Sequence, residues 1–317
     1  MKKDAIFSYK SWLIFSLLLL TGAVLTFSSV RAANQDLESY QVDSWTSSGY
    51  KEVTVKGSSG AESFAAAPKE ECVLDTTDMI SHWPLNEPLG AKTFVDVAGA
   101  FNGTCTDNCP TKTFGKIGGA FTFVASEKDV ISVPADVPPG QGIYDSMANG
   151  DFSAGVWVKT TQICITNEIN NKVFFGRYRD DNINGTWWLG CKEPGGLAVF
   201  RLRDSTDTFR QIDGTSKITD GQWHYIVGVR DAGADKNYLY VDGILENMLE
   251  APLYTGNFSS DMPITMGAYD EPTNYYLDGT LDEVVLYDRV MPANEIGSYY
   301  DACEAASAFT YIPIVRR

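Results

Sequence analysis

Short runs in which apolar and polar residues alternate are spread along the chain from about residue 78 to residue 300. In the run that begins at Phe152, every second residue as far as Val158 falls on one face of an extended strand. Turn residues separate the runs, and Asp242-Gly243 is a pair typical of a tight hairpin. The pattern therefore predicts many short antiparallel strands and very little helix.

Twelve runs fit this description. They cover residues 80–85, 120–124, 130–133, 152–159, 173–178, 187–191, 197–203, 208–212, 223–230, 237–241, 263–268 and 281–287. So many short strands, each bounded by turn residues, predict an all-β fold in which two antiparallel sheets form a β-sandwich of the jellyroll type. After the last run, Pro292 is expected to open a single helical turn, Pro-Ala-Asn-Glu-Ile.

The amino-acid sequences of several runs resemble the motifs of one family. The matching segments are His82-Trp83-Pro84-Leu85-Asn86-Glu87, the stretch Gly115 to Phe123, Gln222 to Val227, Leu239 to Gly243, and the closing strand and turn from Gly279 to Ile296. In this order they resemble the LamG-like jellyroll domains of the concanavalin A-like lectin/glucanase superfamily. The resemblance covers about residues 78–300 and implies the concanavalin A-like jellyroll fold.

The N-terminus has the pattern of a targeting segment. Lys2, Lys3 and Lys10 precede an apolar run, and small residues follow at Ala32 and Ala33. We predict a signal peptide over residues 1–32. If the segment is not cleaved, it would instead anchor the protein in a membrane.

The rest of the chain divides by composition. Residues 33–71 are rich in Ser, Thr, Gly and Glu and predict a flexible spacer, and residues 72–303 hold the jellyroll domain. Residues 304–317 form a C-terminal tail that ends in Arg316-Arg317. This tail is interpreted as either a sorting or attachment segment or one more strand at the edge of the sandwich.

The net charge of −16 narrows the choice of partners. A surface this acidic disfavours nucleic acids and anionic membranes and is compatible with cation binding. The signal peptide predicts a secreted, extracellular protein, which could be attached to a surface.

Six cysteines follow the signal peptide, which predicts disulfides in an oxidising compartment. Cys105 and Cys109 lie in one tight loop, and Cys164 and Cys191 flank one extended segment. That leaves Cys72 and Cys303 to join the two ends of the domain. The rival interpretation is a zinc site, but the sequence contains no Cys-x-x-Cys motif and only two histidines.

Glycoside hydrolases belong to the same superfamily, so the protein could itself be one. Those enzymes resemble one another through an E-x-D-x-E strand that places two carboxylates on one face. The sequence lacks this motif, because Asp282 and Glu283 are adjacent and point to opposite faces of their strand. His82 and His224 are interpreted as strand residues rather than catalytic bases. The prediction is therefore a protein that is not an enzyme, with a glycoside hydrolase as the less favoured alternative.

Two loops rich in aromatic and acidic residues are the candidate ligand sites. Their aromatic rings could stack on sugar faces, and these are Trp187, Trp188, Tyr269 and Tyr275. The neighbouring hydrogen-bonding groups are Asp180, Asp181 and Asn184. Because the two tryptophans are adjacent on a strand, their side chains should point to opposite faces and one ring should be exposed. The alternative is that one tryptophan of each pair belongs to the core and that the acids lie in solvated turns.

The resemblance also implies a structural calcium ion, since many LamG-like jellyrolls carry one. It places Asp282 of the closing strand near Asp96 of an early loop, and Asn102 of that loop is a further oxygen donor. The alternative is that Asp282 caps backbone amides and Asp96 forms an ordinary turn.

From these patterns we predict a secreted recognition or adhesion module that binds carbohydrate or a cell-surface partner. The alternative is a structural module of an extracellular assembly.

Overall fold

The computed structural model describes 39–42, 52–57, 60–65, 72–99, 101–134, 147, 150–164, 171–179, 182–251, 253–258, 262–269 and 275–308. The predicted signal peptide lies outside the described residues, as does the part of the C-terminal tail beyond 308. Within the described ranges, no helix is both long enough and apolar enough to cross a membrane.

The chain divides into two units, and Cys72–Cys303 forms one of them. The other unit contains an antiparallel sheet of three strands: β1 (Ser39–Val42), β2 (Glu52–Gly57) and β3 (Gly60–Ala65). The spacer predicted for residues 33–71 included no strands. Val53 and Val55 alternate with polar residues and are followed by Gly57-Ser-Ser-Gly60, which is the pattern of a hairpin.

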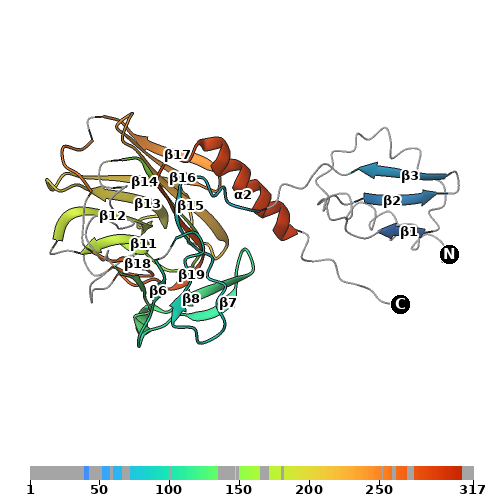
Figure 1. Ribbon diagram of the computed structural model, residues 1–317, viewed down its shortest axis with the longest axis horizontal. Coiled ribbons are helices and arrows are strands. Elements are labelled where there is room, and N and C mark those ends of the chain that lie inside the picture. The colour runs from blue at the N-terminus through green and yellow to red at the C-terminus, as the bar shows by residue number, and fades with distance from the viewer. Residues whose placement is uncertain are drawn as a thin grey trace. The chain divides into compact units, whose positions relative to one another are not determined.

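The unit Cys72–Cys303 is a sandwich of two antiparallel eight-stranded sheets, which confirms the predicted all-β jellyroll fold (Figure 1). Sheet I runs in the order β17-β16-β15-β10-β19-β8-β7, with β4 also pairing with β19. Its strands are β4 (Met79–Trp83), β7 (Thr111–Phe114), β8 (Gly119–Phe123), β10 (Phe152–Lys159), β15 (Trp223–Asp231), β16 (Lys236–Val241), β17 (Ile244–Leu249) and β19 (Gly279–Tyr287).

Sheet II runs in the order β14-β13-β12-β11-β18-β9-β6-β5. Its strands are β5 (Thr93–Phe94), β6 (Gly103–Thr104), β9 (Ile131–Val133), β11 (Asn171–Arg179), β12 (Asn182–Lys192), β13 (Leu197–Arg203), β14 (Phe209–Lys217) and β18 (Ile264–Met266). All twelve predicted runs contain a strand, and β10 and β13 have the predicted bounds. The strands that the pattern missed are β5, β6, β7 and β17, which are short or lie near a sheet edge.

The core lies between the two sheets and is built from alternate residues of their strands. Trp83 and Phe152 from sheet I and Trp187 and Phe200 from sheet II are fully buried there. Phe152 packs on the Trp187 ring with their centroids 5.6 Å apart. Burial of large aromatic rings from both sheets is the main force that holds such a sandwich together.

The predicted single helical turn after Pro292 is too short. The structure has a 16-residue helix, α2 (Ala293–Ala308). Ile296, Tyr299 and Cys303 recur at helical spacing and are buried against sheet I, so tertiary packing extends the helix beyond its first turn.

The three predicted disulfides are confirmed: Cys72–Cys303, Cys105–Cys109 and Cys164–Cys191. The first joins residues 231 positions apart and links the start of the unit to α2. Because the bond closes nearly the whole domain, it removes the most chain entropy from the unfolded state.

Candidate functional site

Rows of paired residues cross β12, β13 and β14 on the face of sheet II that points away from the core. The rows are Thr186–Arg203–Phe209, Trp188–Arg201–Gln211 and Gly190–Val199–Asp213. Directly paired residues on neighbouring strands share a face, and their alternate neighbours Trp187, Leu202 and Ile212 belong to the core. We call these nine residues the outer face of sheet II.

Trp188 forms the floor of this face, and two glycines make room for it. A Cβ atom at Gly176 would lie 2.5 Å from the Trp188 Cβ. One at Gly190 would lie 3.0 Å from the indole ring and 2.0 Å from the carbonyl oxygen of Lys172. Any side chain at either position would displace the indole or the strands, so the sequence can place a tryptophan here only between glycines.

A pair of tyrosines packs against Trp188. Tyr269 meets the indole edge-on at 5.9 Å between centroids, and the Tyr275 ring lies 4.2 Å from that of Tyr269. All three rings are buried, together with Val173 and Val199. The tyrosines that were predicted as sugar platforms are therefore packed in a small cluster with Trp188.

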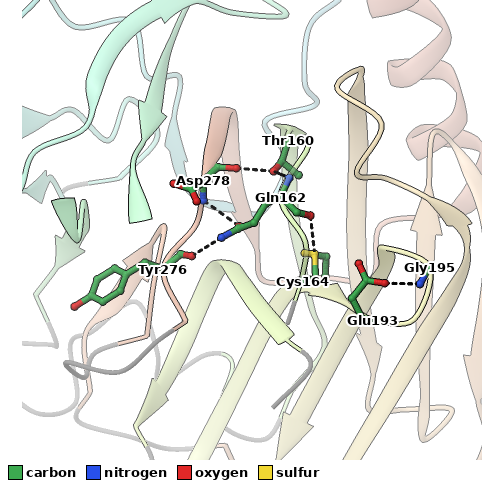
Figure 2. The surroundings of a disulfide bond; sticks show 8 residues. Thr160, Gln162, Cys164, Glu193, Gly195, Tyr276 and Asp278 are labelled. Atoms are coloured by element: carbon green, nitrogen blue, oxygen red, sulfur yellow. Dashed lines mark hydrogen bonds between the residues drawn. A yellow bond between two sulfur atoms is a disulfide. The ribbon is translucent and has the colours of Figure 1, made fainter. Parts of the chain in front are cut away.

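The tyrosine segment is held in place by the side chain of Gln162 (Figure 2). Its Nε2 donates to the Tyr276 carbonyl at 3.0 Å, and its Oε1 accepts from the Asp278 amide at 2.9 Å. The Thr160 hydroxyl also donates to the Asp278 carbonyl, at 2.5 Å. These bonds fix the chain just after Tyr275 much as a neighbouring strand would.

The expectation that one of the two adjacent tryptophans is exposed is wrong. Their side chains do point to opposite faces, but both are fully buried. Trp187 packs edge-on against Phe175 in the core at 5.2 Å, while the tyrosine pair packs against Trp188 on the other face. Both faces of β12 are covered, so neither ring can stack on a ligand in this conformation.

The hydrogen-bonding residues predicted beside these rings cannot be placed. Asp180 and Asp181 lie outside the described residues. Asn184 belongs to β12, but its side chain is also outside the described part of the structure. Their role as ligand-binding neighbours remains a prediction.

The exposed aromatic ring on this face is one that the sequence analysis missed. Phe209, the first residue of β14, is 53% exposed, and the guanidinium of Arg201 lies over its ring at 4.7 Å. Phe209 alternates with Gln211 and Asp213 on the polar side of its strand. An aromatic residue on the polar side of an alternating run was the signal that could have identified it.

Two buried N–H groups on this face have no hydrogen-bond acceptor. They are the Nε1 of Trp188 and the Nε of Arg201, which belong to directly paired residues. A buried donor without an acceptor costs about 1–3 kcal/mol of folding free energy. The face therefore presents two buried donors, and an acceptor that reached either one would recover part of this cost.

Arg203, the other cation of the face, and Lys192, which contacts the face at Asp213, already have anionic partners. Lys192, at the end of β12, pairs with Asp213, and Arg203 pairs with Asp207. Gln211 adds a 2.7 Å hydrogen bond from its Nε2 to Asp213. Within the described residues, Arg201 makes no ion pair with a carboxylate.

The residues predicted to bind calcium are held by other contacts. The Asp96 carboxylate accepts hydrogen bonds from the Ser81 hydroxyl at 2.7 Å and from the amide of His82 at 2.9 Å. It accepts three more from backbone amides within its own loop. The Asn102 side-chain oxygen accepts from the Asp96 amide at 2.9 Å. These oxygens face N–H and O–H donors, whereas calcium ligands must turn their lone pairs toward a cation.

Asp282 lies elsewhere, on sheet I, where it is paired with Trp157. One carboxylate oxygen accepts from the Ile117 amide at 2.9 Å, and the other is buried without a partner. Burial raises the pKa of this carboxyl to about 8. In the described part of the chain, no three acidic, histidine or cysteine side chains gather as a metal site would require. The three residues therefore do not fit a shared calcium ion, and local amide capping accounts for Asp96.

The two histidines are bound to carboxylates within the fold. His82 Nε2 lies 2.6 Å from Glu283, and His224 lies between Asp242 at 2.8 Å and Asp220 at 3.0 Å. These contacts link strands and turns of sheet I, as expected for histidines in strands.

Comparison with known families gives one match. The model of the concanavalin A-like lectin/glucanases superfamily covers residues 129–297, more than half of the chain. No curated protein matches the sequence.

Solved structures resemble the fold at low sequence identity. The binding domain of Paraclostridial Mosquitocidal Protein 1 gives a TM-score of 0.56 at 14% identity, over 72% of this chain and 52% of that one. The botulinum neurotoxin serotype C1 binding domain gives 0.53 at 15% identity, over 72% and 52%. Domain 4 of AbnA, a GH43 extracellular arabinanase from Geobacillus stearothermophilus in complex with arabinotriose, gives 0.50 at 19%, over 70% and 98%. This chain spans about half the length of the toxin domains, and the likeness concerns the fold.

Proposed function

Since the chain belongs to the concanavalin A-like lectin/glucanase superfamily, we propose that its sandwich is a non-catalytic recognition module that binds a glycan through the outer face of sheet II. The observation that carries the proposal is the exposed Phe209 ring beside Arg201, next to two buried N–H donors that lack acceptors.

The chemistry of this face suits a sugar. One side of a pyranose ring presents C–H groups that pack on an aromatic ring, and its hydroxyls accept hydrogen bonds from N–H donors. Phe209 supplies the ring, Arg201 supplies donors, and Gln211 and Asp213 lie beside them with polar side chains. Of the fold neighbours, domain 4 of AbnA was solved with arabinotriose, which is consistent with a glycan ligand on this fold.

Binding without catalysis is supported by the state of the acids near this face. Asp213 is bound by Lys192 and Gln211, and Asp207 is bound by Arg203. A glycosidase needs two carboxylates that face one bond, one to protonate the leaving group and one to attack or to activate water. The acids described here are engaged in ion pairs along the sheet.

The three disulfides support an extracellular location, because such bonds form and persist in oxidising compartments. A glycan of a cell surface or of an extracellular matrix would be accessible to the module there. We therefore propose that the protein is secreted and acts outside the cell, either free or attached to a surface.

The test is to remove the exposed ring. Phe209→Ala should weaken binding to glycans found on a glycan array by about fivefold, because one aromatic contact contributes roughly 1 kcal/mol. Phe114→Ala is the matched control, since Phe114 is 92% exposed but lies in β7 of sheet I. It should leave affinity within about twofold of the parent protein.

Both variants remove exposed side chains, so thermal melts should differ little from the parent. Equal affinity of the two variants would remove the outer face of sheet II from consideration. If no glycan binds the parent protein, the recognition proposal fails and the structural-module alternative gains support.

A further inference from the structure

Arg201 differs from Arg203, the other cation of the outer face of sheet II, and from Lys192 at the end of β12. Lys192 and Arg203 are neutralised by Asp213 and Asp207, whereas Arg201 has no carboxylate partner within the described residues. The protein carries a net charge of −16, so acidic partners for an arginine are abundant in its sequence. An arginine that is partly buried yet unpaired in such a protein marks a place for an anion supplied from outside.

We infer that the glycan bound at this face carries a carboxylate, as in a uronic acid, and that Arg201 binds that carboxylate. The inference rests on the proposed glycan-binding function and specifies the ligand of the same site.

The geometry favours a planar anion. The Nε of Arg201 is buried and lacks an acceptor, and the guanidinium Cζ lies over the Phe209 ring, 4.7 Å from its centroid. Packing against the ring restricts how the guanidinium can turn. The Nε–H and one terminal N–H are parallel, and a carboxylate can accept from both at once.

A neutral sugar would be a poorer hydrogen-bond acceptor for the N–H groups of the Arg201 guanidinium. A hydroxyl offers one oxygen to the pair of parallel donors, whereas a carboxylate offers two oxygens at matching spacing together with a full negative charge. The nearest described acid on the face, Asp213, is already neutralised by Lys192, so its repulsion of an anionic ligand is reduced. Phe209 would meanwhile contact the sugar ring that carries the carboxylate.

The experiment uses the full chain and matched pairs of probes. Oligomers of galacturonate, glucuronate, mannuronate and guluronate are each titrated against their methyl esters, which keep the sugar ring but lose the charge. For at least one pair, the acid should bind about tenfold more tightly than its ester, as expected for a charge-assisted bidentate pair. Raising the salt concentration should reduce this preference, because a partly exposed ion pair is screened.

Variants separate charge from geometry. Arg201→Gln should abolish the preference for the acid, and Arg201→Lys should keep part of it, because lysine retains the charge but not the fork. Lys236→Gln is the control: it removes one positive charge from sheet I, where Lys236 pairs with Glu250 at 2.8 Å. It should leave the preference unchanged. Thermal melts of each variant exclude misfolding as the cause.

Failure of this inference differs from failure of the proposed function. If acid and ester bind equally and binding still requires Phe209, the carboxylate inference is overturned while glycan recognition stands. The same holds if an array shows binding only to neutral glycans. If no glycan binds the parent protein at all, the proposed function and this inference fall together.

Discussion

The outer faces of the two sheets differ in what covers them. On sheet I, helix α2 lies over the strands, and Figure 1 shows it beside β16 and β17. There Trp157 stacks with Tyr300 at 5.6 Å and packs on Tyr225 at 5.2 Å, so its ring is enclosed by aromatic neighbours. On sheet II the β13–β14 end has no helix over it among the described residues, and the Phe209 ring is exposed.

Both faces contain buried polar atoms without partners, but their surroundings differ. On sheet I these atoms are the Tyr225 hydroxyl and one oxygen of Asp282, and both belong to fully buried residues near α2. On sheet II they are N–H groups of Trp188 and Arg201, beside an exposed ring. An unpaired group beneath a helix only costs stability, whereas one beside an open aromatic ring can gain a partner from a ligand. The contacts of the first face contribute to folding, and the second face is the one proposed to bind a ligand.

The largest effect on the helix-covered outer face of sheet I is expected from removing the disulfide that joins α2 to the start of the domain. Replacing Cys72 and Cys303 together by serine should lower the free energy of unfolding by roughly 5 kcal/mol, because the bond closes a loop of 231 residues. The matched control, Cys105→Ser with Cys109→Ser, opens a separation of only 4 residues and should cost roughly 2 kcal/mol. Urea unfolding measures both, and equal losses would contradict the loop-entropy account.

A second test concerns how the stability of the protein depends on pH through Asp282, which lies on the same sheet. The folded-state pKa of Asp282 is about 8, against an ordinary value of 3.8, because the carboxyl is buried. Between these values the unfolded chain ionises while the folded one stays protonated. The contribution of this group to stability is therefore fully present below pH 3.8 and is lost as the pH rises to about 8, by at most about 1.4 kcal/mol per pH unit.

Asp282→Asn mimics the protonated carboxyl and should flatten this slope. Urea unfolding at pH 5.5, 7 and 8.5 measures this slope. The free energy of unfolding of the variant should increase relative to that of the parent protein as the pH rises. A parallel decline of both proteins would show that other groups cause it. Calcium at millimolar concentration should not change the melting temperature of the parent protein. A calcium-dependent rise in melting temperature that the Asp282→Asn variant lacks would instead identify Asp282 as an ion ligand.

The fold could be predicted because its information is local and repeated. In β10 Phe152, Ala154, Val156 and Val158 fall on one face, and β13 is a short apolar run that ends in alternation, so the local pattern gives the bounds of both. The disulfides followed from the order of the cysteines along the chain. Helix α2 could not be sized in this way, because Tyr299 and Cys303 are stabilised by contacts with sheet I that are distant in sequence.

The candidate site was predicted only in part, because exposure is a tertiary property. Alternation assigned Trp187 and Trp188 to opposite faces, but the tyrosine pair that packs against Trp188 comes from about 80 residues later in the chain. Phe209 stands on the polar side of its run, but nothing in the sequence around it indicates that β14 is an edge strand and that its ring is exposed. The hydrogen-bond partners of the predicted calcium ligands could not be predicted either, because some come from distant segments, as Ile117 does for Asp282.

The smallest predicted effect is a difference in the free energy of unfolding between two variants, each of which replaces one tryptophan on the outer face of one sheet. Trp157 Nε1 donates to the Tyr299 hydroxyl at 3.3 Å, whereas Trp188 Nε1 has no acceptor. Both indoles are fully buried, so replacing either by phenylalanine removes a similar volume. Trp157→Phe also loses a hydrogen bond, while Trp188→Phe removes an unsatisfied buried donor. Trp157→Phe should therefore lower the free energy of unfolding by about 1–2 kcal/mol more than Trp188→Phe. Urea unfolding of the two variants checks this difference, and an equal or reversed order would mean that the Trp188 N–H finds an acceptor in the free protein.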